Sequence, residues 1–224
     1  MSNQLQKQLA IETHSEQAGL FVARYDVIKE CPYQNCFTYS RKRLNYILDR
    51  YLPKRGKGLN LLDVGCGTGY HLKRYKNHGF NIIGVDGSSE MLNEARNSNP
   101  EIDFKQCDVD FIPLPDKSFD VILCIEVLRY LPDITPCLNE ITRLLKPGGI
   151  ALVTASPILQ ASLYPLVNKF TSSKQIGNFT NLKQFFHSKG HLENNFIEFG
   201  NGDRPFQSKH KLFTVRIFLT LRSY

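Results

Sequence analysis

One segment of the chain combines a carboxylate with a run of glycines, a pattern typical of a loop that binds a charged ligand. Residues 63–69 read Asp-Val-Gly-Cys-Gly-Thr-Gly. Glycine is needed where the backbone adopts a positive φ or approaches a ligand closely. A dinucleotide loop has a third glycine where Tyr70 stands here, and Asp63 would repel a pyrophosphate. An ammonium group, by contrast, would be attracted to that carboxylate. The loop therefore favours a ligand that carries an ammonium group.

Two further carboxylates follow apolar segments and are candidates for the same site. Asp86 could accept hydrogen bonds from both hydroxyls of a ribose. It could instead cap the next helix, although Ser88 can also fill that role. Asp108 could accept an exocyclic amine, the alternative being a solvated turn carboxylate, which we expect of Asp110 and Asp116.

These residues lie where short apolar strands alternate with helices, which indicates a parallel sheet covered on both faces. We expect strands at 59–64, 81–85, 103–107, 119–125 and 150–155, helices at 71–78, 88–97 and 134–145, and a turn at 146–149. Two helices should precede the sheet, at 4–30 and 37–52. A helix at 180–189 and strands at 192–199 and 212–221 should follow it, the last two as an antiparallel hairpin at the sheet edge.

The order and spacing of these motifs over residues 44–155 resemble the class I S-adenosylmethionine-dependent methyltransferases. The resemblance is carried by the glycine loop, Gly84–Asp86, Cys107–Val109, Phe119–Ile122 and Leu144–Gly149. It implies an α/β fold: a Rossmann-like, doubly wound sheet of seven strands, mostly parallel with an antiparallel edge strand, and an N-terminal helical cap. We expect the cap at 1–57 and the S-adenosylmethionine-binding domain at 58–224, with a substrate-side insertion at 156–178.

The resemblance also assigns expected roles around S-adenosyl-L-methionine. Asp63 would lie near the methionine ammonium group, Asp86 would hold the ribose, and Asp108 with Val109 would frame the adenine. An arginine upstream of the glycine loop would meet the methionine carboxylate, with Arg43 the first choice and Arg41 the reserve. The expected cofactor-binding residues are Arg43, Asp63, Gly65, Cys66, Gly67, Asp86, Gly87, Met91, Asp108, Val109 and Ile125.

The acceptor side of the site is less well defined by the sequence. Glu126, Arg129 and Tyr130 follow the fourth strand, where the reacting methyl should sit. Many relatives carry a histidine near the Arg129 position, and this chain does not. A base is needed only when the nucleophile must first lose a proton, so no catalytic residue is assigned. Tyr25, Tyr33, Tyr39 and Tyr130 are expected to wall the substrate pocket, with core packing as the alternative for any one of them.

Several other kinds of site are disfavoured. His187 and His191 lie four residues apart, but Gly190 separates them and the glutamate of HExxH is missing, so no metal site is expected. The Asn/Asp-Pro-Pro-Tyr signature of adenine or glutamine methylation is absent after the fourth strand. The Pro136-Cys137 pair lies in a predicted helix, which argues against the cysteine nucleophile of an RNA cytosine enzyme.

Composition narrows the class of protein and its surroundings. The 224 residues carry a net charge of +7, and 42% are hydrophobic, as in ordinary globular proteins. Residues 1–58 carry +5, residues 59–156 carry −4 and residues 157–224 carry +6, so the basic flanks suggest an anionic acceptor or partner. No stretch approaches the roughly 18 apolar residues that span a bilayer, and the N-terminus lacks a secretory pattern. Six cysteines without a CxxC pair are typical of free thiols in the cytoplasm.

The sequence therefore predicts an enzyme that transfers a methyl group from S-adenosylmethionine to O or N of a small molecule. It would belong with the ubiquinone-type and natural-product methyltransferases, and its acceptor would be an anionic or carboxylate-bearing metabolite. Nucleic acid and membrane insertion are not expected, and no oligomeric state is indicated. The alternatives are a methyltransferase that acts on RNA or a peptide, and a cofactor-binding scaffold without catalysis.

Overall fold

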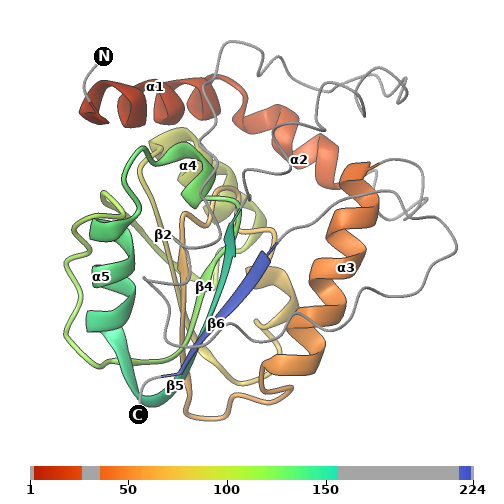
Figure 1. The fold of residues 1–224 in the computed structure, drawn as a ribbon. Helices are drawn as coiled ribbons and strands as arrows, with labels where there is room; N and C mark the ends of the chain where they lie inside the picture. The colour runs from red at the N-terminus through yellow and green to blue at the C-terminus, as the bar shows by residue number, and fades with distance from the viewer. Residues whose placement is uncertain (1–2, 27–35, 156–216, 223–224) are drawn as a thin grey trace, which may run out of the picture.

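A six-stranded sheet organises the chain. The computed structural model of the 224-residue protein describes residues 3–26, 36–155 and 217–222 (Figure 1). The strands are β1 (Asn60–Val64), β2 (Asn81–Asp86), β3 (Asp103–Gln106), β4 (Phe119–Cys124), β5 (Leu145–Ala155) and β6 (Ile217–Arg222). They lie in the order β3-β2-β1-β4-β5-β6. The first five run parallel, and β6 pairs antiparallel with β5.

The α/β class, the five parallel strands and the antiparallel edge strand agree with expectation. The seventh strand of the expected sheet is not among the described residues. The helix expected at 180–189, the strand expected at 192–199 and the insertion at 156–178 all fall outside the described part of the chain.

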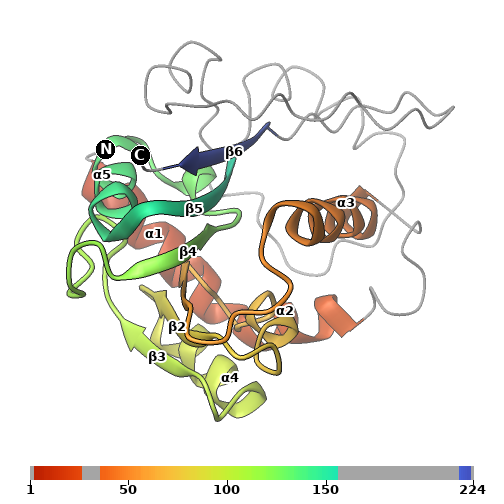
Figure 2. The same cartoon turned by 90° about the horizontal axis from the view of Figure 1, so that it is seen from below.

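The central strands are buried on both faces because their successive side chains point in opposite directions. On one face, Leu62 and Ile122 pack with α5 (Thr135–Leu144) in one apolar cluster. On the other face, Leu61 and Leu123 pack with α3 (Cys36–Tyr51) and α4 (Ser89–Ser98). Figure 2 shows α3 and α5 on opposite sides of the sheet. A parallel sheet covered on both faces buries the continuous apolar runs that the sequence displays.

The N-terminal segment forms two helices where one was expected. The structure has α1 (Asn3–Glu16) and α2 (Ala18–Asp26), separated at Gln17, so the single helix predicted over 4–30 is wrong. The chain turns there through a bond from the Gln17 amide to the His14 carbonyl. Gly19, just beyond, is a weak helix former. The turn lets α1 lie across the carboxyl ends of the strands and contact α4 (Figure 1).

Two predicted elements differ from the structure. The helix expected at 71–78 is a single 3₁₀ turn, η2 (Leu72–Arg74), followed by turns, because its backbone bonds join residues three apart. Residues 146–149 are not a separate turn but part of β5. The pairing of β4 with β5 shifts register between Phe119 and Val121, which accommodates Pro147 and Gly148 (φ 77°) in the strand.

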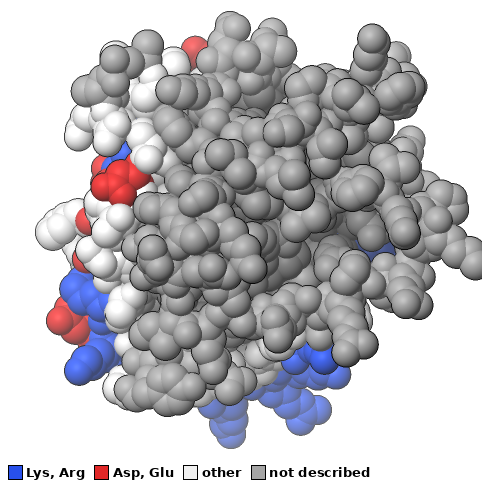
Figure 3. All heavy atoms as spheres, viewed as in Figure 1, with Lys and Arg blue, Asp and Glu red and all other residues white. Residues whose placement is uncertain are grey.

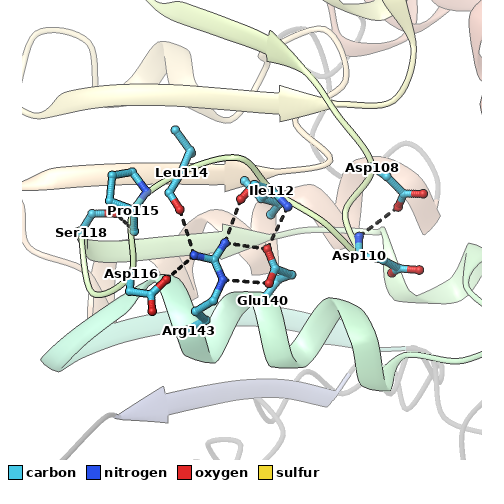
Figure 4. Close-up of polar contacts among 9 residues, drawn as sticks. All are labelled: Asp108, Asp110, Ile112, Leu114, Pro115, Asp116, Ser118, Glu140 and Arg143. Carbon is cyan, nitrogen blue, oxygen red and sulfur yellow. Dashed lines mark hydrogen bonds and ion pairs between the residues drawn. The ribbon is translucent and has the colours of Figure 1, made fainter.

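The segment after β3, which carries Asp108 and Val109, is fastened to α5 by Arg143. Its guanidinium donates to the carbonyl oxygens of Ile112 (2.8 Å) and Leu114 (2.9 Å), and it pairs with Asp116 and Glu140 (Figure 4). Glu140 in turn accepts the Ile112 amide at 2.8 Å. Hydrogen bonding to Glu140 and Asp116 raises the pKa of Arg143, so the charge is permanent.

Candidate functional site at the carboxyl edge of the sheet

The glycine loop joins β1 to η2 and is tied to the end of β2. The Gly65 and Cys66 amides both donate to the Val85 carbonyl, at 2.8 and 2.9 Å. Gly65 has φ 68°, and a Cβ there would lie 2.3 Å from Val127 Cγ2. Gly69 has φ 72°, and its Cβ would lie 2.9 Å from Asn99 Nδ2. These two glycines are required by packing inside the protein.

Gly67 differs from its two neighbouring glycines because it faces open space. Its φ is 52°, and a Cβ built there would meet nothing within 4 Å. A ligand can therefore approach the backbone at this point, which is the use of glycine that the sequence motif suggests.

Asp86, at the end of β2, organises the loop beside it. Its Oδ2 accepts the Gly67 amide at 2.8 Å, and its Oδ1 accepts the Ser88 amide at 2.9 Å. Ser88 is the N-cap of α4, since its Oγ accepts the Met91 amide at 3.1 Å. Burial raises the pKa of Asp86, although the backbone hydrogen bonds partly offset this effect. Ser88, and not Asp86, therefore caps α4. Each carboxylate oxygen of Asp86 retains a lone pair that can accept a hydrogen bond from a ligand.

Asp63, at the end of β1, is buried without a full set of partners. It is 1% exposed, and its Oδ2 has no hydrogen-bond partner. Burial raises the pKa of this carboxyl well above its ordinary value, and the nearby charge of Asp86 acts in the same direction. Buried polar atoms are normally paired, so an unpaired acceptor indicates a missing donor. An ammonium group would satisfy it.

The other residues expected at the cofactor border the same edge. Cys66, Met91, Val109 and Ile125 are all buried. Asp108 is exposed and bridges to Lys7 of α1, whose Nζ lies 2.6 Å from Asp108 Oδ1 and 2.5 Å from Asp110 Oδ2.

Helix α1 covers this edge directly. A Cβ on Gly87 would lie 2.8 Å from Ile11 Cδ1, and Ser15 Oγ lies 2.7 Å from Ser88 Oγ. The N-terminal helix thus contacts the residues expected at the ribose and the adenine. No motif in the sequence predicts these contacts.

The structure brings Arg41, the reserve candidate, to the end of β4. Arg41 is 2% exposed, with Nη2 3.2 Å from Glu126 Oε1 and Nη1 3.0 Å from His71 Nε2. Glu126 also pairs with Arg129 at 2.8 Å. Arg43 lies on α3, but its side chain is outside the described part of the chain, so its role stays a prediction.

His71 and Glu126 carry further signs of a site. A guanidinium only donates, so His71 Nε2 must accept and Nδ1 carries the proton. That buried Nδ1 has no partner, and burial, followed by the charge of Arg41, lowers the pKa of His71 well below its ordinary value. Glu126 has φ 66°, a strained conformation for a residue with a side chain.

Aromatic side chains of α1 and α2 meet rings from the glycine loop and from the segment after β4 near this cluster. Tyr25 stacks on Tyr70 with ring centroids 4.1 Å apart, and Tyr130 meets His14 edge-on at 4.7 Å. Tyr39 lies on α3, its side chain outside the described residues, and Tyr33 falls wholly outside them. Sequence reasoning missed His14 and Tyr70, since no motif links α1 or α2 to the sheet.

A cavity of about 640 Å³ lies at the amino ends of the strands, opposite the candidate site. It is lined by segments that precede β1 and β2, including Lys54, Arg55 and Arg74, and by no residue predicted for the site. Lys and Arg side chains gather along the lower edge of the molecule in the view of Figure 3. Part of the basic N-terminal segment therefore lies far from the carboxyl edge.

The described residues contain neither a membrane-spanning helix nor a metal-ligand cluster. No helix within them is long and apolar enough to cross a membrane, and no cluster of three potential metal ligands occurs among them. His187 and His191 fall outside the described part. Cys66, Cys107, Cys124 and Cys137 are free thiols.

Comparisons with known proteins identify the same region of the chain. Residues 62–153 match the family described as a methyltransferase domain. A malonyl-[acyl-carrier protein] O-methyltransferase of Yersinia pestis is 34% identical over 101 residues, covering 45% of this chain and 38% of that protein. A ubiquinone biosynthesis O-methyltransferase of Coxiella burnetii is 32% identical over 130 residues, covering 56% and 54%. The chain thus spans about half, or less, of the length of these relatives.

A solved structure shares the fold over most of the chain. The PH0226 protein of Pyrococcus horikoshii superposes with a TM-score of 0.64 and 21% identity, covering 85% of this chain and 93% of that one.

Proposed function

We propose that this protein, whose residues 62–153 match the methyltransferase-domain family, is a class I S-adenosylmethionine-dependent enzyme that methylates a hydroxyl or amine of a small molecule. One observation supports the proposal above all. The carboxylate oxygen of Asp63 that lacks a partner is near the end of β1, and the open backbone of Gly67 follows it in the glycine loop, at the carboxyl edge of the sheet. A ligand with an ammonium group fits that combination, and a pyrophosphate does not.

The chain's own residues would hold S-adenosylmethionine along this edge. Asp63 would accept the methionine ammonium, and Arg41 with the Nδ1 proton of His71 would donate to the methionine carboxylate. Asp86 would accept the ribose hydroxyls. When bound, the cofactor supplies an electrophilic methyl group on its sulfonium.

The remaining task of the protein is to position an acceptor and exclude water. Helix α1 and the rings of Tyr25, Tyr70 and Tyr130 would form the wall over the acceptor. The two relatives named above are O-methyltransferases, which supports a small-molecule or carrier-bound oxygen acceptor. The finer proposal is an acceptor with a carboxylate, which Arg129, in the 3₁₀ turn that follows β4, would attract.

Calorimetry with S-adenosylhomocysteine, the cofactor's product form, tests the proposal. We expect binding by the full chain, and an affinity about 10- to 100-fold lower in Asp86→Asn, because hydrogen bonds to a charged group are worth about 1.5–3 kcal/mol. Asp103→Asn, on an edge strand and paired with Lys105, is the matched control and should bind normally. No heat with the native chain, or equal affinity in the two variants, would contradict the proposal.

A further inference from the structure

The cavity at the amino ends of β1 and β2 has walls that are fastened to each other. One wall is the end of α3, and the other is the segment between η2 and β2. Arg74 joins the two, because it pairs with Asp49 and donates to Asn45 Oδ1 at 2.9 Å. The volume of about 640 Å³ is in the range of pockets that hold a small molecule, roughly 300–1,000 Å³.

The loop that precedes β1 closes the cavity on its remaining side and is itself held in place. The Gly56 amide donates to the His78 carbonyl at 2.8 Å, and the Leu59 amide donates to the Gly56 carbonyl at 2.7 Å. A Cβ on Gly56 would collide with the ring of Phe80, so the loop and the start of β2 are in close contact. The backbone that carries Lys54 and Arg55 is therefore fixed beside the cavity.

The inner lining of the cavity is apolar. Leu48, Leu52 and Tyr75 line it, and each is at most 5% exposed. All three belong to the apolar cluster on this face of the sheet, where the Tyr75 ring meets Phe80 edge-on at 5.6 Å. A ligand that enters the cavity would thus bring an apolar body against these side chains.

The rim of the cavity carries positive charge that nothing nearby neutralises. Lys54 and Arg55 line the cavity and are exposed. Among the residues that the structure describes, no carboxylate forms an ion pair with either of them. Asp49, the one acidic residue of the lining, is already paired with Arg74. The rim therefore has two uncompensated cations above an apolar interior.

We propose that this cavity is a second ligand site, which binds a phosphate monoester with an apolar body. Such a phosphate carries a charge of about −1.5 to −2 at neutral pH, which matches Lys54 and Arg55. A guanidinium can also bind two phosphate oxygens at once. The apolar body would pack on Leu48, Leu52 and Tyr75. The cavity lies opposite the candidate cofactor site, so the inference goes beyond the proposed function and does not depend on it.

Fluorescence titration with 1-naphthyl phosphate tests whether the site exists and is separate. We expect the full chain to bind this probe with the same affinity in the absence and in the presence of saturating S-adenosylhomocysteine. Displacement of the probe by S-adenosylhomocysteine would place it in the cofactor site and overturn the proposal, as would a native chain that does not bind the probe. A chain that binds the probe but not S-adenosylhomocysteine would reject the proposed function and leave this site intact.

A matched pair of double variants separates the site from general charge attraction. We expect Lys54→Gln with Arg55→Gln to weaken probe binding at least about 10-fold, because hydrogen bonds to charged groups are lost. Lys57→Gln with Lys73→Gln removes the same charge from exposed residues that do not line the cavity, and should bind normally. Thermal unfolding checks that both variants fold. Equal affinities in the two variants would overturn the proposal.

Two further probes test the class of ligand. Inorganic phosphate should bind at least about 10-fold more weakly than 1-naphthyl phosphate, because it leaves the apolar lining uncovered. Equal affinity for the two would overturn the apolar body. A single-stranded DNA oligonucleotide should not compete for the cavity. Tighter binding of the oligonucleotide, with a steep dependence on salt, would replace the small-molecule site with a nucleic-acid surface.

Discussion

Arg41 and Glu126 form a buried ion pair that joins α3 to the end of β4. Arg41 Nη2 lies 3.2 Å from Glu126 Oε1, and the arginine side chain is only 2% exposed. The two residues are 85 positions apart, and Glu126 is strained at φ 66°. The pair therefore holds a strained backbone in place directly beside the candidate methyl site.

Replacing Arg41 should be costly for both stability and binding. We expect Arg41→Met to lower the free energy of unfolding by about 1–3 kcal/mol, because it removes the buried charged partner of Glu126 Oε1 and of His71 Nε2, while Arg129 still pairs with Glu126. Chemical denaturation of the empty protein measures this loss. Lys42→Met, on the exposed side of the same helix, should change it by less than about 0.5 kcal/mol. Equal losses in the two variants would contradict the assignment.

Gly65→Ala and Gly67→Ala should separate packing from binding. Both strain a positive φ, which costs about 1–2 kcal/mol. Only the methyl group at residue 65 collides with Val127, so Gly65→Ala should be the less stable protein. Gly67→Ala should keep most of its stability and lose affinity for S-adenosylhomocysteine. Thermal unfolding and calorimetry on the two variants test this, and the reverse ranking of stability would refute the open-face interpretation of Gly67.

Cofactor binding should release a proton from Asp63. The pKa of Asp63 is raised in the folded protein without cofactor. Between the unfolded-state pKa of about 4 and this raised pKa, the folded state keeps a proton that the unfolded state loses. The free energy of unfolding therefore falls as the pH rises through this range. A bound ammonium favours the carboxylate, so affinity should increase with pH over the same range. Calorimetry in buffers of different ionisation enthalpy measures the proton.

Asp63→Asn is the matching variant. It should abolish the proton release and weaken binding. The empty protein should be at least as stable as the native chain at pH 8, because a buried carboxylate without a full set of partners has been removed. A marked loss of stability would show that Asp63 has a structural role.

Arg143→Leu should destabilise the segment that carries Asp108 and Val109. The change removes the hydrogen bonds to two backbone carbonyls and the cation that pairs with Glu140, which should cost about 1–3 kcal/mol. Hydrogen exchange should rise in residues 108–118 before it rises in β1. Arg50→Leu, on the exposed face of α3, is the control, and equal protection in the two variants would argue against this role for Arg143.

The sequence by itself determined the alternation of strands and helices and the identity of the loop residues. Period and composition are local properties, so β1, β2, β4 and the Ser88 cap could be predicted within a residue or two. The helix predicted at 71–78 was wrong because the backbone bonds there join residues three apart. The turn predicted at 146–149 was wrong because these residues belong to β5, which pairs with β4. Local signals say little about either.

Only the tertiary structure decided which side chains meet at the site. Arg41 precedes Leu44, a buried residue of α3, by three positions, and the packing of α3 on the sheet brings it to Glu126. His14 reaches Tyr130 because α1 turns at Gln17 and lies across the strand ends. Contacts between residues about a hundred positions apart depend on the rotation and height of whole helices. Those are set by the summed packing of apolar faces, a quantity that no single motif in the chain encodes.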